Sequence, residues 1–174
     1  FVISLGEVPV NFPLHFRIPS WCRQAQVSVN GNEFSRCKGD TIIVLRRDWK
    51  NGDRVELELP MNIVFTNWYE NSTAIERGPL TYALKIGEKW DKVINDKDPV
   101  RFGAYYFEVR PTTPWNYGLP DFPEDKIQEM FTIVQKDTMP SYPWNLDNAP
   151  IELRAKAKRL TNWKLYNETA GPLP

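Results

Sequence analysis

The sequence predicts an all-β protein, a β-sandwich of mostly antiparallel strands with long loops rich in proline and aromatic residues. Apolar and polar residues alternate with a period of two in many short segments, as half-buried strands require. Asn-Gly turn signals separate these segments near the N-terminus. Two later stretches, 111–125 and 139–150, combine prolines with aromatic rings and show no periodicity, which is typical of ordered loops.

The first strand is predicted in "FPLHFRI" (12–18). Its four apolar residues occupy every second position and share one face, whereas His15 and Arg17 lie on the other. His15 is therefore expected to be a surface residue rather than a catalytic one.

Asn30-Gly31 predicts a tight hairpin turn, because this dipeptide readily accepts the positive φ of a type I′ turn. Counting outward from the turn places Gln24 opposite Cys37, so Cys22 lies two residues beyond that register. We therefore expect two free thiols, while a disulfide would require a bend in the strand. One histidine, His15, leaves too few ligands for a Cys/His zinc site.

A second hairpin is predicted from strand-like segments at 40–49 and 53–60, which Asn51-Gly52 separates. In the later segment Val55, Leu57 and Leu59 are expected to face the core. Three more segments extend the β pattern, with a break at "RGP": 62–68, 72–77 and 79–86. Residues 1–86 are thus predicted to form a meander of six to eight short strands.

The second part, 87–174, has longer connections. Gly87–Arg101 is charged and rich in turn residues, so we predict a long connection there. Strands are predicted at 104–110, 130–136 and 151–160, with a short helix at 124–131 as an alternative. We interpret 1–174 as one β-sandwich domain and expect it to be a piece of a longer chain.

Charge and composition limit the classes of partner. Lys plus Arg and Asp plus Glu both number 22, and neither sign forms a long run that would bind phosphates. No apolar run approaches the roughly 20 residues of a membrane-spanning helix. Gly-rich phosphate loops, serine elbows and calcium-loop spacings are also missing. We therefore expect no nucleic-acid or membrane partner and no cofactor in this segment.

Aromatic residues are abundant, with seven Trp, seven Tyr and nine Phe. Rings in proline-stiffened loops are ordered in advance and can stack on the apolar face of a sugar. The candidate substrate-binding residues are therefore Trp115, Asn116, Tyr117 and Trp144. For the loop "RPTTPWNYGL" (110–119) we favour packing on the fold or on a partner domain over direct sugar contact.

Six segments of the sequence, taken together in their order and spacing, are fairly specific to one protein family. They are "FPLHFRIPSWC" (12–22), "VSVNG" (27–31), "WKNGDRVELELPM" (49–61), "IERGPLTYAL" (75–84), "FEVRPTTPWNYGL" (107–119) and "RLTNWKLYNETAGPLP" (159–174). Together they resemble the C-terminal part of bacterial glycoside hydrolases of the β-L-arabinofuranosidase type, formerly a domain of unknown function.

The resemblance implies an accessory role. In that family the β-sandwich domains pack on an (α/α) barrel, and cleavage is attributed to a cysteine nucleophile beside a zinc held by cysteines and a glutamate, all in the barrel. No position here matches those motifs, so no catalytic or metal-binding residue is carried over, and Cys22 matches a strand end instead. The resemblance also implies a periplasmic or secreted parent enzyme that acts on plant-type polysaccharide, with the missing N-terminal barrel as the partner.

Two other functions stay open. An independent carbohydrate-binding module would use the loop rings on an oligosaccharide. A complete enzyme would need two carboxylates flanking a glycosidic bond. Its candidates would be Glu70, Glu76, Asp121 and Glu124.

Overall fold

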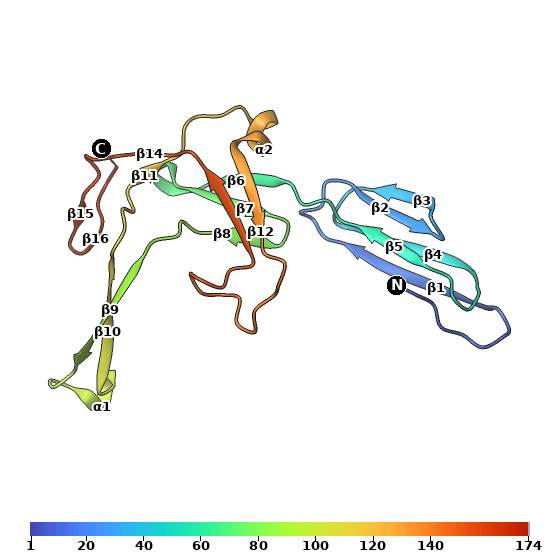
Figure 1. Ribbon diagram of the computed structural model, residues 1–174, viewed down its shortest axis with the longest axis horizontal. Coiled ribbons are helices and arrows are strands. Elements are labelled where there is room, and N and C mark those ends of the chain that lie inside the picture. The colour runs from blue at the N-terminus through green and yellow to red at the C-terminus, as the bar shows by residue number, and fades with distance from the viewer. Residues whose placement is uncertain (174) are drawn as a thin grey trace. The chain divides into compact units, whose positions relative to one another are not determined.

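The computed structural model describes residues 1–173, and nearly all of its regular elements are β-strands joined by loops (Figure 1). Within that range there are sixteen strands and two α-helices of four residues each. The paired strands are antiparallel in every register that the structure defines. The prediction of an all-β fold of antiparallel strands is confirmed.

The chain divides into two compact units. Unit 1 contains Phe1–Trp68 with Thr73–Thr81, and unit 2 contains Tyr69–Ser72 with Tyr82–Pro174. The sequence suggested a division after residue 86, close to the last boundary of unit 1. The prediction that 1–174 form one domain stays a prediction.

Unit 1 opens with two small sheets. In the first, β1 (Val10–Ile18) pairs with β4 (Thr41–Trp49). In the second, β2 (Ala25–Val29) lies between β3 (Asn32–Cys37) and β5 (Val55–Glu58). Each sheet has one apolar face, and the two apolar faces share a single buried core.

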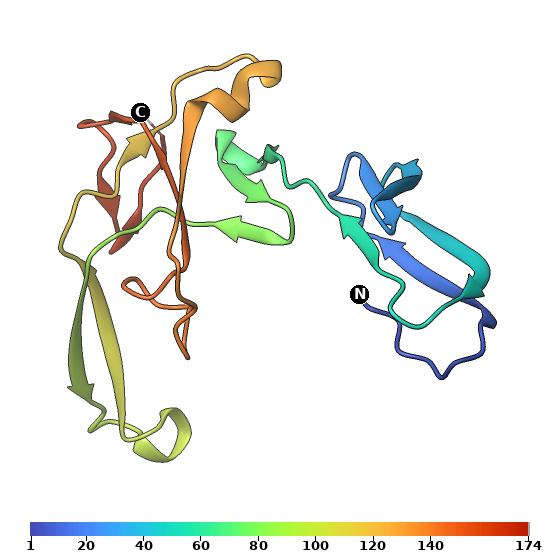
Figure 2. The ribbon, with the colours of Figure 1, turned by 45° about the vertical axis from the view of Figure 1, so that its right-hand side comes forward.

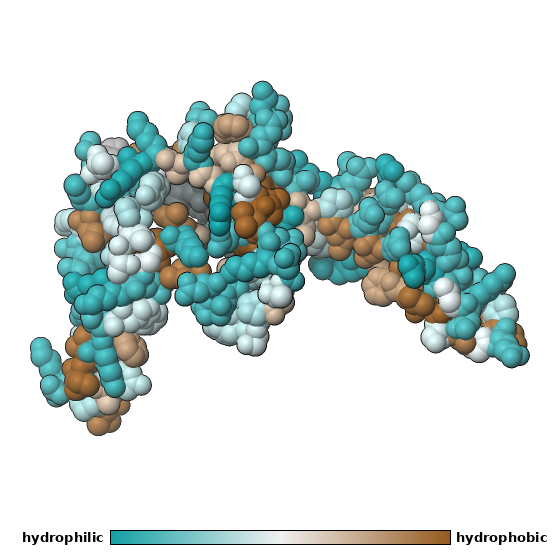
Figure 3. All heavy atoms as spheres, viewed as in Figure 1, coloured by the Kyte–Doolittle hydropathy of each residue, from teal (hydrophilic) through white to brown (hydrophobic). Residues whose placement is uncertain are grey.

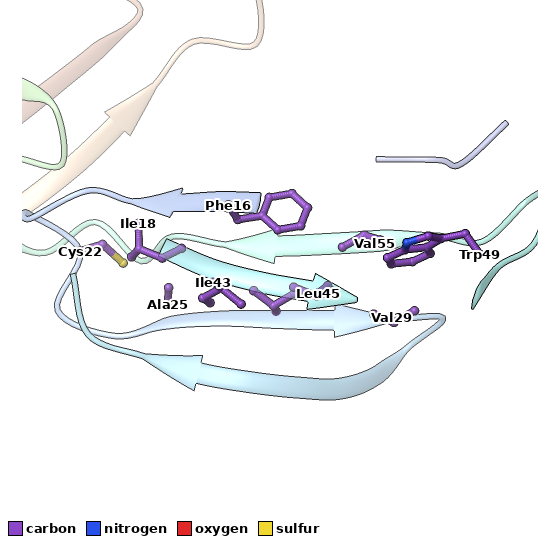
Figure 4. Close-up of a cluster of buried hydrophobic side chains, with 10 residues drawn as sticks. Phe16, Ile18, Cys22, Ala25, Val29, Ile43, Leu45, Trp49 and Val55 are labelled. Atoms are coloured by element: carbon purple, nitrogen blue, oxygen red, sulfur yellow. The ribbon is translucent and has the colours of Figure 1, made fainter. Parts of the chain in front are cut away.

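The core of unit 1 draws alternate side chains from both sheets (Figure 4). Its members are Phe16, Ile18, Cys22, Ala25, Val27, Val29, Ile43, Leu45, Trp49 and Val55. Leu57 and Leu59 pack against this cluster, while His15 lies exposed on the opposite face of β1. The facing predicted from the period of two is therefore confirmed for β1 and β5.

The predicted second hairpin is wrong, because β4 and β5 do not pair with each other. The turn at Lys50–Asp53 forms as expected, with Gly52 at a φ of 85°. It carries the chain from one sheet to the other, since β4 pairs with β1 and β5 pairs with β2. Crossing between sheets lets both strands cover the same core, which a flat hairpin would not achieve.

The predicted register around the first hairpin is wrong by one residue. Ala25, not Gln24, lies opposite Cys37, because a bulge between Val27 and Ser28 shifts the pairing. Cys22 is fully buried and Cys37 half-buried, and both are free thiols, as expected.

The two turns of unit 1 are joined through Asp53. Its carboxylate accepts hydrogen bonds from the Lys50 backbone N–H and the Asn30 side-chain amide, both at 2.9 Å. The Asn30 side-chain oxygen in turn accepts a bond from the backbone N–H of Arg54. These bonds favour the ionised form, so the Lys50 N–H first and the Asn30 amide second lower the pKa of Asp53.

A third sheet contains β6 (Ile63–Asn67), β7 (Thr73–Arg77) and β8 (Leu80–Tyr82), with β7 in the centre. The short 3-10 turn η1 (Tyr69–Asn71) joins the first two strands. Gly78, with a φ of 60°, lies at the turn before β8, where "RGP" predicted a break. The predicted strands of this region are confirmed.

In unit 2 the predicted long connection at Gly87–Arg101 is wrong. It contains a strand, β9 (Glu88–Ile94), and a short helix, α1 (Pro99–Phe102). Figures 1 and 2 show β9 and β10 (Tyr105–Pro111) as a two-stranded ribbon. Four of the first five residues of β9 are charged, so its sequence does not show a clear period of two.

The two faces of the β9–β10 ribbon differ in chemistry. One face bears the ion pairs Lys89–Asp91 and Arg110–Glu108. Together with the charged Glu88 and Lys92, the other face carries apolar and aromatic side chains that remain about half exposed: Trp90, Ile94, Tyr105, Phe107 and Val109. Figure 3 shows hydrophobic and hydrophilic residues side by side in this part of the chain. Neighbouring rings on this face meet edge to face.

The rest of unit 2 is made of short pieces. β12 (Phe131–Gln135) pairs with β13 (Ile151–Ala155), which confirms two predicted strands. The alternative helix also forms just before β12, as η2 (Glu124–Lys126) followed by α2 (Ile127–Met130). The remaining short strands are β11 (Tyr117–Gly118), β14 (Lys158–Arg159), β15 (Leu165–Tyr166) and β16 (Thr169–Ala170), paired as β11 with β14 and β15 with β16.

Candidate functional site

The loop between β10 and β11, together with the first residue of β11, contains three of the predicted substrate-binding residues. Trp115 is half-buried, and its ring meets that of Trp163 at a centroid distance of 5.0 Å and an interplanar angle of 65°. Tyr117 opens β11, lies opposite Arg159 of β14 and is half-buried as well. The proline-rich loop is therefore held against the segment around 159–163 of the same unit.

The side chain of Asn116 stabilises the contact between the proline-rich loop and the segment around 159–163. Its side chain is only 8% exposed, and its amide donates to the carbonyl oxygens of Leu160 at 2.9 Å and Trp163 at 3.1 Å. The Asn116 backbone oxygen also accepts the Leu160 N–H at 2.8 Å. Since both amide hydrogens are engaged, Asn116 orders the loop; its predicted contact with substrate stays a prediction.

An open groove of about 640 Å³ lies beside the two tryptophan rings. Its lining residues are Pro111, Thr112, Thr113, Pro114, Trp115, Asn116, Arg159, Trp163, Lys164 and Leu165. A volume of this size falls within the range of roughly 300–1,000 Å³ that is usual for small-ligand sites. The groove thus combines two rings, two hydroxyls and two cations.

The cations of the groove have free hydrogen-bonding capacity. The Arg159 Nε donates to the Asn116 side-chain oxygen at 3.4 Å, and the guanidinium has further N–H donors beyond this one. Neither Arg159 nor Lys164 forms an ion pair with any residue in the described range 1–173. The Trp163 ring is fixed separately, because its Nε1 donates to the Gly171 carbonyl at 2.7 Å.

The fourth predicted residue lies elsewhere in unit 2. Trp144 is in the loop between β12 and β13 and is 72% exposed, and its neighbour Tyr142 is exposed too. Within this loop, the Asn145 side chain accepts two backbone hydrogen bonds, from Asp147 and Asn148. The structure places Trp115 and Asn116 in the lining of the groove, whereas Tyr117 and Trp144 lie outside that lining.

Three groove residues were not predicted from the sequence: Arg159, Trp163 and Lys164. They lie more than 40 positions beyond Trp115, and the bonds that join the two segments span separations of 43 to 47 residues. The only sequence signal was that "RLTNWK" belongs to a segment of the family resemblance. No local pattern indicates that it would meet the proline-rich loop.

The carboxylates considered for a complete enzyme occupy ordinary positions. Glu76 in β7 accepts a long hydrogen bond, 3.4 Å, from the Thr66 hydroxyl. Glu70 lies in η1 with a φ of 52°, and Asp121 and Glu124 are exposed near η2. For none of these four groups does the structure add a feature that favours catalysis.

Among the described residues, no group of three or more His, Cys, Asp or Glu side chains is placed to hold a metal ion. No helix in the same range is long and apolar enough to cross a membrane.

Comparison with known families identifies part of unit 1. Residues 3–61 match the family model described as the GH127 middle domain of β-L-arabinofuranosidase. That range contains all ten members of the unit 1 core. The resemblance to the β-L-arabinofuranosidase type of glycoside hydrolase is therefore confirmed, with residues 3–61 as the segment that carries it.

Two solved structures are similar over parts of their length. A chain described as a glycoside hydrolase is 24% identical, and the match covers 66% of this chain and 23% of that one, with a TM-score of 0.38. A GH127 β-L-arabinofuranosidase from Geobacillus stearothermophilus T6 is 20% identical, with 90% and 24% covered and a TM-score of 0.40. This chain spans about a quarter of the length of either structure. No curated protein sequence matches it.

Proposed function

We propose that this chain is a noncatalytic β-sandwich part of a glycoside hydrolase of the β-L-arabinofuranosidase type that acts on plant-type polysaccharide. The observation that carries the proposal is the match of residues 3–61 to the middle domain of that family. In this proposal the chain packs on an (α/α) barrel of the same polypeptide, the barrel performs the chemistry, and this segment binds no cofactor. The parent enzyme is periplasmic or secreted.

Unit 1 is well suited to a supporting role. Its core is continuous and apolar, so it forms a stable platform without a ligand. Asp53 is the one buried carboxylate among the described residues, and it accepts two hydrogen bonds that link the turns. A second unit with exposed aromatic surface offers contact area for a further domain.

The test compares three samples on p-nitrophenyl β-L-arabinofuranoside. They are the native polypeptide from the source cells, the same polypeptide truncated before these residues, and the 174-residue chain alone. We expect hydrolysis by the native polypeptide, weaker or unstable activity after truncation, and none by the chain alone. Turnover by the chain alone would contradict the proposal, as would a native polypeptide with a mass of 20.3 kDa.

The groove beside Trp115 favours a second candidate function, an independent carbohydrate-binding module. Rings next to polar side chains are the usual composition of a sugar site. This alternative expects a native mass near 20.3 kDa and retention of the chain on an insoluble polysaccharide. Retention lost on changing Trp115 to Ala, but kept on changing the exposed Trp144 to Ala, would support it.

A further inference from the structure

We propose that the groove beside Trp115 and Trp163 binds an acidic oligosaccharide through the carboxylate of a uronic acid residue. This inference rests on the proposed function for its ligand class, a saccharide, and adds the charge of that saccharide. Three features carry it: the pair of rings, the two cations and the absence of negative charge in the lining.

The rings provide an apolar wall. Trp115 and Trp163 meet edge to face, at an interplanar angle of 65°, and both residues line the groove. The Trp163 indole is held by its bond to the Gly171 carbonyl, and the Trp115 backbone is held between Pro114 and the buried Asn116. A sugar ring can stack on this wall with little loss of side-chain entropy.

The cations provide the selectivity. The planar Arg159 guanidinium matches a carboxylate with two parallel hydrogen bonds, and Asn116 orients it by accepting from Nε. Lys164, which follows Trp163 directly in the sequence, adds a second positive charge to the lining of the groove. No Asp or Glu is among the described residues that line the groove. A carboxylate entering it therefore meets two unpaired cations and no repulsion.

Polar groups at the entrance suit the hydroxyls of a sugar. Thr112 and Thr113 line the groove, and Thr113 is positioned because its hydroxyl oxygen accepts the Gly87 N–H at 2.8 Å. That bond leaves the Thr113 hydroxyl hydrogen available as a donor. A neutral sugar could use the rings and hydroxyls, but it would gain nothing from Arg159 and Lys164.

The test is calorimetric titration of the whole 174-residue chain with digalacturonic acid and, separately, with the neutral digalactose of the same linkage. We expect the acidic disaccharide to bind at least about tenfold more tightly, since charge-assisted bidentate bonds are roughly twice as strong as neutral ones. The preference should shrink in about 0.5 M NaCl, where exposed charges are screened. Equal affinity for the two sugars, or no binding of either, would overturn the proposal.

Amino-acid substitutions test whether the two cations, rather than the fold as a whole, are responsible for the affinity. Arg159→Gln and Lys164→Gln should each reduce affinity for digalacturonic acid by about tenfold or more and should leave affinity for digalactose unchanged. Lys156→Gln, an exposed lysine of the same unit outside the groove, is the matched control and should have no effect. If the Lys156 change weakened binding as much as the Lys164 change, general charge attraction would explain the result and the proposal would fail.

The Arg159 side chain contacts Asn116, so its variant could disturb the loop. Lys164→Gln removes no hydrogen bond in the described structure and serves as the independent variant. The experiment involves no barrel and no hydrolysis. If the titration shows no preference for the acidic disaccharide, the proposed role on a catalytic barrel is unaffected. If the hydrolysis test contradicts that role, the titration can still be interpreted.

Discussion

Replacing Leu45 by alanine should destabilise unit 1 far more than the same change at its neighbour Val44. Leu45 is 0% exposed and points into the core, whereas Val44 is 47% exposed on the outer face of β4 (Figure 4). The two residues are adjacent in one strand, so they share the same local backbone. The difference between the two variants reports mainly burial, although valine also has the higher strand propensity and loses one carbon fewer.

The expected magnitude follows from the atoms removed. Leu45→Ala deletes three buried carbon groups, worth about 2.4 kcal/mol at about 0.8 kcal/mol per buried methylene. A residual cavity adds to this cost, and leucine-to-alanine changes in well-packed cores fall at about 2.7–5.0 kcal/mol. We therefore expect the free energy of unfolding of unit 1 to fall by about 3 kcal/mol. Val44→Ala should cost less than about 1 kcal/mol.

The assay is hydrogen–deuterium exchange, because it reads unit 1 separately from unit 2. Amides of β2, Ala25–Val29, pair on both sides and should exchange through opening of unit 1. A loss of about 3 kcal/mol corresponds to exchange that is more than about 100-fold faster at these amides. Equal acceleration by both variants, or a change at Leu45 below about 1 kcal/mol, would refute the assignment of the core.

Three further predictions concern single contacts. The folded-state pKa of Asp53 is lowered from 3.8, so its stabilising effect is present above pH 3.8 and is lost as the pH falls through the folded value. In a plot of the urea midpoint of unfolding against pH, Asp53→Asn should therefore reduce the loss of stability on the acid side, the acid limb. Gly78→Ala should lower stability by about 1–2 kcal/mol because its φ is 60°, whereas Gly6→Ala, with open space around it, should not change the melting temperature. Asn116→Ala leaves two carbonyls unpaired and should cost about 1–3 kcal/mol, seen as faster amide exchange at Leu160. An unchanged acid limb, a stable Gly78 variant or unaltered exchange at Leu160 would each contradict the contact concerned.

Only part of the candidate site could be predicted from the sequence. The proline-rich loop stood out because rings and prolines cluster there, and Trp115 does line the groove. Its partners Arg159, Trp163 and Lys164 sit in a segment without periodicity and without a recognisable local motif. Their proximity depends on Asn116, whose hydrogen bonds reach across 44 and 47 residues.

The sequence by itself determined most strands of unit 1 and the buried faces of β1 and β5, whereas it did not reveal β9. A period of two fixes the facing of Phe16 and Val55, and Asn-Gly or Gly-Pro signals fix the turns, because both depend only on neighbours along the chain. Tertiary structure alone decided the strand partners. β4 pairs with β1 rather than β5, and a bulge moves Cys37 opposite Ala25. Partners and register depend on how two sheets enclose one core, and that is a property of contacts between distant segments.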